Sequence, residues 1–429
     1  MRSRVSTSPS PLRIADFRKF WFARFASVAA TMGMVVIIGY QLYDVARSEY
    51  GMSIPQASLQ LGILGLVQFV PIFLLTPVAG VVADMFDRRK VAAGAMCIDL
   101  FIALGLGIAT TLEIHSLPLL FTFAALHGSA RVFVGPAVSA IAPNIVPESA
   151  IPRAIAFNAI AWQAGSVIGP ASYGFLFAYD RALPYWVSLA LIVLATASIM
   201  AIRSLPPPPA EARQTHPLRQ IVRGIHFVWR ERFLLGCITL DLFAVLFGGA
   251  TALLPVFARD ILHVGPEGLG PMRAAPAFGA AIVALILSFR PFNSNVGVKM
   301  LLAVAGYGAA TIAFGLSTNY GLSLLFLALL GASDMLSVFI RNSLIQLNTP
   351  DDVRGRVSAI SGVAVSASNE LGEMQSGVAA AILGASGAVV FGGGAAIVVT
   401  ALWAWLFPEI RHARTFAPQY RQREQVHEG

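Results

Sequence analysis

Seven charged side chains of this sequence lie inside long apolar stretches. They are Asp99, Arg131, Asp241, Asp334, Arg341, Glu370 and Glu373. A charge at the centre of a lipid-spanning helix costs about 2.5–3.5 kcal/mol on insertion scales, so such residues commonly carry protons or contact ions and polar solutes. The other interpretation is a structural ion pair or a polar contact between helices, and for Asp99 and Arg341 it is equally favoured.

Glu370 and Glu373 are three residues apart, so they share one face of a helix. Two close carboxylates repel each other, and this repulsion favours the binding of a proton by one of them. The pair is therefore a candidate proton carrier. Hydrogen bonds that hold its helix against neighbouring helices are an equally good explanation.

Tyr40, Gln41, Tyr43 and Asp44 form a polar cluster at the end of the first apolar stretch. These side chains could contact a small molecule. Packing, or contacts with an outer loop, explains the cluster better.

The sequence also contains an internal repeat with an offset of 203 residues. The stretch from His127 onward aligns without a gap to the stretch from Leu330 onward. In this alignment Gly128 meets Gly331, Pro147 meets Pro350 and Arg153 meets Arg356. The same offset makes Arg131 and Asp334 equivalent. Such a repeat is typical of proteins built from two related halves.

These residues belong to a chain of 429 residues that is 56% hydrophobic and 12% charged. Soluble domains carry about 25% charged residues, so a soluble protein of this composition would lack polar surface. Because about 20 apolar residues span a bilayer, the length suffices for about a dozen spans with short loops. We therefore expect an all-α membrane protein.

Hydropathy divides the chain into twelve apolar runs, most of them separated by Pro, Gly or charge clusters. Their approximate limits are 17–44, 57–83, 90–112, 117–146, 153–178, 184–203, 232–258, 268–289, 298–317, 320–348, 355–382 and 385–408. The first run is too long for a signal peptide, so we interpret it as an uncleaved span. The expected organisation is a tail at 1–16, a six-helix half at 17–203, a central loop at 204–231, a six-helix half at 232–408 and a tail at 409–429.

The distribution of basic residues predicts the orientation of the chain. The expected outer loops contain only Arg47, Arg181 and Arg259, while most of the 30 Lys and Arg residues fall in the tails and the alternate loops. Positive residues favour the cytoplasmic side. We therefore expect both termini in the cytoplasm, with the basic loops beside anionic lipid.

Several function classes are excluded by what the sequence lacks. The net charge of +8 lies in short clusters between apolar runs, a pattern that favours a lipid partner and argues against nucleic acid. Cys97 and Cys237 both lie in apolar runs without a CxxC partner, and the seven histidines form no HxxxH pair, so we expect no metal site. No phosphate-binding loop or Ser-His-Asp constellation is present. We expect neither an enzyme nor a cofactor.

A short charged loop follows the second apolar run and reads GVVADMFDRRK. It resembles the signature loop of the major facilitator superfamily, although Met85 stands where that pattern usually has Arg or Lys. The matching residues are Gly80, Asp84, Asp87, Arg88, Arg89 and Lys90. Basic residues alone would serve as membrane anchors, so it is the spacing of Asp84 that carries the resemblance. The resemblance implies an inner latch in which Asp84 meets Arg354 and Arg356.

The fifth run contains GSVIGP, with Gly165, Gly169 and Pro170, and resembles part of the motif of antiporters in that superfamily. The longer pattern would have further glycines at Ala156 and Tyr173, so the match is partial. Later stretches, above all SNELGE in the eleventh run, resemble the enterobactin-exporter-type branch. This branch implies proton-driven efflux of siderophores or amphipathic drugs.

The resemblance also implies a fold and a mechanism. Twelve helices would form two pseudo-symmetric halves in a bacterial inner membrane, working as a monomer by alternating access. Spans one, four, seven and ten would line a cavity, so Arg131 and Asp334 would face each other and Asp241 would be a second proton acceptor. The main alternative is an importer or facilitator of the same fold. A membrane enzyme and a receptor that does not transport are further alternatives.

Overall fold

The computed structural model describes residues 10–139, 141–204, 225–290 and 292–417. Within helices, nothing is described for the side chains of Pro77, Gly80, Val81, Ala83, Asp84, Pro136, Ser139, Asp351, Asp352 and Ala359. Most of the expected central loop, 204–231, and much of the expected tails therefore fall outside the described residues. The described residues contain helices and no strand, as the composition predicted.

The chain forms two compact units. The first comprises Met1–Gln41 with Val70–Thr215, and the second comprises Leu42–Phe69 with His216–Gly429. Two long helices contribute to both units, α1 (Ala15–Ser48) and α2 (Ile54–Met85), as their bounds show. Each unit is described by itself below.

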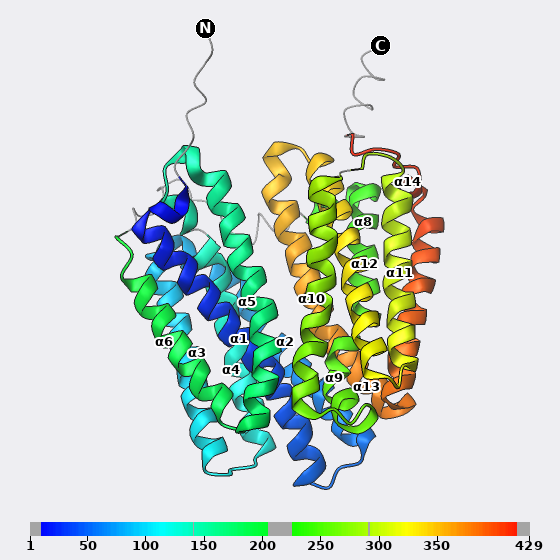
Figure 1. Ribbon diagram of the computed structural model, residues 1–429. Coiled ribbons are helices and arrows are strands. Elements are labelled where there is room, and N and C mark those ends of the chain that lie inside the picture. Colours follow the sequence, from blue (N-terminus) through cyan, green and yellow to red (C-terminus); the bar gives the residue numbers. More distant parts are fainter. Residues whose placement is uncertain (1–9, 140, 205–224, 291, 418–429) are drawn as a thin grey trace, which may run out of the picture. The chain divides into compact units, whose positions relative to one another are not determined.

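In its described residues the first unit also contains four further long helices and three short 3-10 helices (Figure 1). They are α3 (Arg88–Thr111), α4 (Leu117–Ser139), α5 (Ile151–Tyr179) and α6 (Leu183–Met200), with η1 (Pro11–Arg13), η2 (Ala142–Asn144) and η3 (Glu148–Ala150). Within this unit α3 packs against both α4 and α6.

The other helices whose bounds are described belong to the second unit (Figure 1). They are α8 (Arg232–Phe247), η5 (Ala250–Leu253), α9 (Leu254–Val256), the π-helix η6 (Phe257–Ile261), α10 (Gly265–Phe289), α11 (Val296–Leu316), α12 (Tyr320–Leu347), α13 (Asp351–Leu406) and α14 (Pro408–Arg411). In this unit α12 packs against α10 and α11, and α13 packs against α8 and α11.

Ten helical segments of the described residues are long and apolar enough to cross a membrane. One of them, Val353–Leu406, consists of two helices, because Gly384 has a φ of 75° and a ψ of 164°. α5 has 29 residues but is not among the ten, and polar residues such as Asn158 and Gln163 lower its hydropathy. With α5 included and the two helices at Gly384 counted separately, the twelve expected spans are present.

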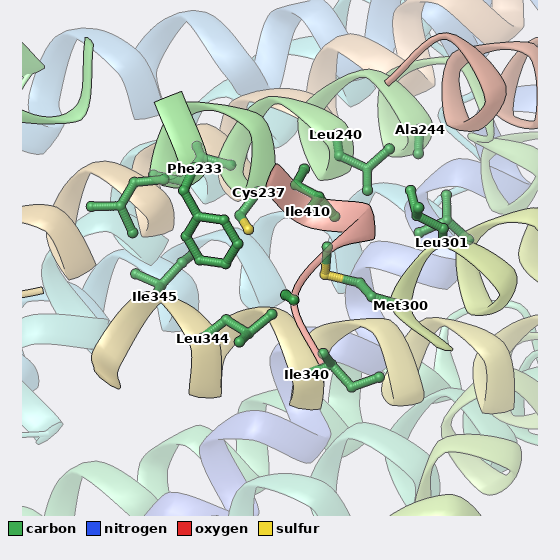
Figure 2. Close-up of a cluster of buried hydrophobic side chains, with 14 of the residues drawn as sticks. Phe233, Cys237, Leu240, Ala244, Met300, Leu301, Ile340, Leu344, Ile345 and Ile410 are labelled. Carbon is green, nitrogen blue, oxygen red and sulfur yellow. The ribbon is translucent and has the colours of Figure 1, made fainter. Parts of the chain in front are cut away.

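Apolar packing on one side of α8 builds the core of the second unit. Figure 2 shows Phe233 and Cys237 of α8 together with Leu344 of α12, Met300 of α11 and Ile410 of α14. All five side chains are buried. Removing this apolar surface from water holds α14 against the start of α11.

The internal repeat has a structural counterpart. Pro147 and Pro350 are the N-cap residues of η3 and α13, with extended ψ angles of 153° and 150°. Gly169 and Gly372 have the same offset. A Cβ at Gly169 would lie 2.3 Å from the carbonyl oxygen of Ala29 on α1, and one at Gly372 would lie 3.0 Å from that of Val245 on α8. Equivalent glycines thus allow equivalent helices to approach closely.

The seventh span differs from the continuous run expected at 232–258. α8 ends at Phe247, and Gly248 and Gly249 interrupt the helix before η5, α9 and η6 carry the chain on to Ile261. The hydroxyl of Tyr307 on α11 donates a 2.7 Å hydrogen bond to the carbonyl oxygen of Gly248, which also accepts a 2.7 Å bond from the backbone N–H of Ala250. Interrupted helices in membrane proteins commonly mark binding sites.

Candidate functional site

Asp241, expected to be a proton acceptor, forms an ion pair with Arg341. Asp241 lies on α8 and Arg341 on α12, and both side chains are buried. Buried charges of opposite sign compensate each other when they pair. The ion pair fits the structural interpretation that the sequence left open for Arg341. The role of Asp241 as a proton acceptor stays a prediction.

Asp334 lies on α12 and is partly buried. Its carboxyl is close enough to Tyr307 to act on that hydroxyl electrostatically. Among the described residues of the second unit, no Lys, Arg or His forms an ion pair with Asp334. A carboxyl in this setting is suited to binding a proton or a positively charged group. Tyr307 connects it to the interruption at Gly248.

Glu373 lies 4.0 Å from Arg273 of α10, measured from Oε1 to Nη2. The same guanidinium donates a 3.1 Å hydrogen bond to the carbonyl oxygen of Thr251 in η5. Arg273 therefore joins the segment after the interrupted helix to α13. Glu370 is buried one turn earlier on α13. The sequence suggested no cation as a partner for either glutamate.

The α13 helix that carries these glutamates also contacts the part of α2 that belongs to the second unit. A Cβ at Gly65 would lie 2.8 Å from the Cβ of Glu373. A Cβ at Gly62 would lie 2.9 Å from the carbonyl oxygen of Met374 and 3.0 Å from the Cα of Gly377. The two glycines of α2 thus allow a close helix crossing beside Glu373.

Five residues at the end of α1 and in η6 form an ion-pair network, which we call the outer cluster. It consists of Tyr43, Asp44, Arg47, Arg259 and Asp260. Arg259 Nε lies 3.4 Å from Asp44 Oδ1, and Arg47 Nη2 lies 3.4 Å from Asp260 Oδ1. The hydroxyl of Tyr43 donates a 2.6 Å hydrogen bond to Asp260. The outer-loop interpretation of Tyr43 and Asp44 agrees with these contacts.

Gln41 makes its contacts within the first unit. Its Nε2 donates to Thr110 of α3 over 3.1 Å, and its Oε1 accepts a 2.6 Å bond from the Tyr185 hydroxyl of α6. These bonds hold three helices together, so packing accounts for Gln41.

In the loop after α2, Asp87 caps α3. Its Oδ1 accepts a 3.0 Å hydrogen bond from the backbone N–H of Arg89, and its Oδ2 lies 2.7 Å from the Arg89 guanidinium. The side-chain bond from Arg89 lowers the pKa of the Asp87 carboxyl, with help from the backbone bond. Arg89 also donates to the carbonyl oxygen of Ile202 after α6. Arg89 is thus buried and links the start of α3 to the residues after α6, while Lys90 is exposed.

The expected latch partners are described only in part. The side chains of Gly80 and Asp84 fall outside the description. Arg354 donates to the carbonyl oxygens of Gln346 and Thr349, over 3.1 and 3.2 Å, and so closes the turn between α12 and α13. Arg356 is partly buried. The meeting of Asp84 with Arg354 and Arg356 stays a prediction.

Arg131 and Asp334 belong to different units, on α4 and α12, and their pairing also stays a prediction.

The glycines of the partial antiporter motif pack tightly within the first unit. A Cβ at Gly165 would lie 2.9 Å from the carbonyl oxygen of Phe25 on α1. Pro170 is buried inside α5 beside Gly169.

Asp99 has a partner that the sequence reasoning missed. Nδ1 of His127 on α4 lies 2.8 Å from Oδ1 of Asp99 on α3, and both side chains are buried. In the sequence, only the shared apolar setting of the two residues could have indicated this contact. In the described part of the chain, no three His, Cys, Asp or Glu residues gather closely enough to hold a metal ion.

The family model described as "Transmembrane secretion effector" matches residues 6–426. The enterobactin exporter EntS of Escherichia coli O9:H4 (strain HS) is 27% identical over 413 residues, which cover 94% of each chain. Among solved structures, a mutant of the peptide transporter POT in complex with sulfate matches with a TM-score of 0.72 and 14% identity, over 95% of this chain and 100% of that one. A bacterial homologue of the human lysosomal transporter Spinster matches with a TM-score of 0.71 and 14% identity, over 94% and 98%.

Proposed function

This chain belongs to the transmembrane secretion effector family of major facilitator transporters, and from that membership we propose that it exports a small molecule by proton-coupled alternating access. The two halves of such a transporter rock about a site near the middle of the membrane, which opens to one side at a time. The transport requires neither catalysis nor a cofactor.

The observation that carries the proposal is the similarity to the enterobactin exporter along 94% of both chains. A match of this extent leaves no room for an added catalytic domain within the matched region. We infer that the cargo is a siderophore or an amphipathic drug-like molecule. This substrate class rests on the likeness to the enterobactin exporter.

We further propose that the protein lies in a bacterial inner membrane as a monomer with both termini in the cytoplasm. The bacterial relatives support this location, and the basic loops support this orientation. The outer cluster would then face the periplasm, and the loop with Asp87 and Arg89 would face the cytoplasm.

For coupling, we propose that Asp334 is the leading proton acceptor, because no cation described in its own unit forms an ion pair with its carboxyl. Arg131, at the equivalent position of the first half, would be its cavity partner. Glu370 and Glu373 would respond to protons through Arg273, which binds Glu373 and the segment after the interrupted helix. Asp241 would support this site through its pair with Arg341.

Two charge networks would act as gates. The outer cluster joins the end of α1 to η6, and its opening would release the periplasmic side. Asp84, with Arg354 and Arg356, would hold the cytoplasmic side closed. The tight contact of Gly165 and Gly169 with α1, beside Pro170, would let α1 and α5 move together.

An importer or facilitator with the same fold is the alternative, and the direction of transport separates the two. In everted membrane vesicles with an acidic interior, we expect enterobactin, used as the probe, to accumulate until a protonophore is added. An amphipathic cationic dye serves as the second probe. Accumulation of a probe only in right-side-out vesicles would favour import.

The cargo itself is best found in cells. In a deletion strain, a secreted metabolite should fall in the medium and rise inside the cells relative to the parent strain. Complementation with the intact gene should restore its secretion. Identical metabolite profiles in both strains would contradict export.

A further inference from the structure

We propose that Asp99 and His127 form a site that binds and releases a single proton during the transport cycle. Nδ1 of His127 lies 2.8 Å from Oδ1 of Asp99, and each side chain is 1% exposed. The proposal rests on the secondary transport proposed above. It adds a proton site within the first unit, where Arg131 is the single charged residue assigned to coupling so far.

The pair joins two helices that also pack on each other. Asp99 lies on α3 and His127 on α4, and α3 packs in addition against α6. A tether between α3 and α4 needs only a hydrogen bond, which a Ser, Asn or Gln side chain would supply without an ionisable group. Two ionisable groups in the same buried position form the hydrogen bond and also give the pair a charge that depends on its protonation.

The proton count of the pair follows from its chemistry. With Asp99 ionised and His127 neutral, Nδ1–H donates to the carboxylate and the pair has a net charge of −1. One added proton gives either an imidazolium beside a carboxylate or a neutral imidazole beside a carboxylic acid. Both forms have zero net charge. The proton comes from water on the side that is open and returns to water when the other side opens.

The other ring nitrogen gives the proton a place to enter. Nε2 of His127 is buried and has no hydrogen-bond partner among the described residues. A buried polar atom without a partner is unfavourable and is uncommon in folded proteins. Because Nδ1 is engaged by Asp99, Nε2 is the ring atom that is free to take or give a proton.

The charged and titratable groups on the packed helices limit which form is stable. Besides His127, α4 carries Arg131, which lies four residues further on and therefore on the same face. α3 carries Arg88, Arg89 and Lys90 at its start and Cys97 two residues before Asp99, and the titratable residue of α6 is Tyr185. A positive charge on Arg131 stabilises the negative, deprotonated pair. Arg131 thus makes proton release possible and connects the pair to the proposed cavity.

The direct test is nuclear magnetic resonance of the full chain in lipid nanodiscs with 15N-labelled histidine. The chain has seven histidines, and the His127→Gln variant identifies the signals of His127. We expect these signals to report a change in the protonation of His127 over the pH range in which the chain stays folded, and this change to differ in Asp99→Asn. His127 signals that stay in one protonation state over this range would overturn the proposal.

Transport gives the second test. Asp99→Asn keeps a hydrogen-bonding side chain of similar shape but cannot ionise, so we expect loss of proton-driven enterobactin accumulation with exchange of the probe retained. Ser129→Ala on α4 is the matched control, because it removes the hydroxyl that bonds to the Ala125 carbonyl oxygen without changing a titratable group. Full accumulation by a folded Asp99→Asn would overturn the proposal.

The two tests separate the pair from the transport function. The resonance measurement on the wild-type chain needs no transported molecule, and the His127→Gln variant serves only to identify the signals of His127. If the wild-type chain moves neither probe, the proposed function fails while the titration still decides the proton site.

Discussion

Arg341 of α12 and Asp241 of α8 form an ion pair in which the two residues are only 3% and 6% exposed. Removing one partner leaves the other charge buried, which should cost about 3–5 kcal/mol. The double variant Asp241→Leu with Arg341→Met leaves no unpaired charge, so it should unfold at a higher temperature than Asp241→Leu alone. Thermal unfolding in detergent measures this. If the losses of stability in the two single variants add up to the loss in the double variant, this would contradict a direct pair.

The outer cluster should control access from the outer side. Asp260→Asn weakens its bonds to Arg47 and Tyr43, so the end of α1 should separate from η6 more often. A cysteine at Ala46, which is 0% exposed, should then react faster with a membrane-impermeant maleimide. Glu113→Gln is the control, because it removes an exposed charge outside the cluster. Equal labelling in both variants would argue against a gate at this position.

The predicted inner latch can be tested in the same way from the other side. Asp84→Asn should weaken the contact with Arg354 and Arg356 and shift the population toward inward-open forms. The reporter is a cysteine at Gly355, where a Cβ meets no atom within 4 Å, in a chain without Cys97 and Cys237. Labelling of this cysteine that does not change with Asp84→Asn would count against the latch.

The predicted cavity pair calls for a double-mutant cycle. If Arg131 and Asp334 face each other, each single variant, Arg131→Gln or Asp334→Asn, should lose thermal stability. Each single variant should also be expressed at a lower level than the double variant. The reason is that a single change leaves one charge unpaired, at a cost of about 3–5 kcal/mol. Transport by the double variant should no longer depend on protons. If the stability losses simply add, the two residues do not meet.

Asp87 predicts a dependence of stability on pH. Its pKa is lowered by the bonds from Arg89, so the ionised form stabilises the fold above the ordinary carboxyl pKa. This contribution is lost as the pH falls through the lowered pKa. Because Asn still caps a helix, Asp87→Asn should have a lower Tm than wild type at neutral pH, and the gap should close below about pH 4. A gap that is the same at every pH would contradict the role of charge.

The spans could be predicted from hydropathy alone. A helix that crosses the lipid layer needs an apolar run of sufficient length, and each run shows this length by itself. The boundary between the last two runs fell at Gly384, where the helix indeed breaks. The repeat was readable as well, since Pro147 and Pro350 start equivalent helices for the same local reason. The family resemblance of the chain rested on such local patterns and is confirmed by the match over residues 6–426.

The partners of the charged residues could not be predicted in this way. Whether Asp241 meets Arg341, or Asp99 meets His127, depends on the rotation of each helix and on which helices are neighbours. Neither property can be predicted from the hydropathy pattern of a single run. The interruption at Gly248 and Gly249 was missed for a related reason. The apolar residues that follow continue the apolar run, although the backbone does not continue the α-helix.

The sharing of α1 and α2 between the two units has a consequence for attempts to express the halves separately. A cut in the central loop would divide the chain between its sixth and seventh spans, yet residues 42–69 pack with the second unit. The N-terminal fragment would then present Gly62 and Gly65 to lipid in place of α13. The two fragments should therefore rescue each other only when they are synthesised together, since each completes a surface that the other leaves open.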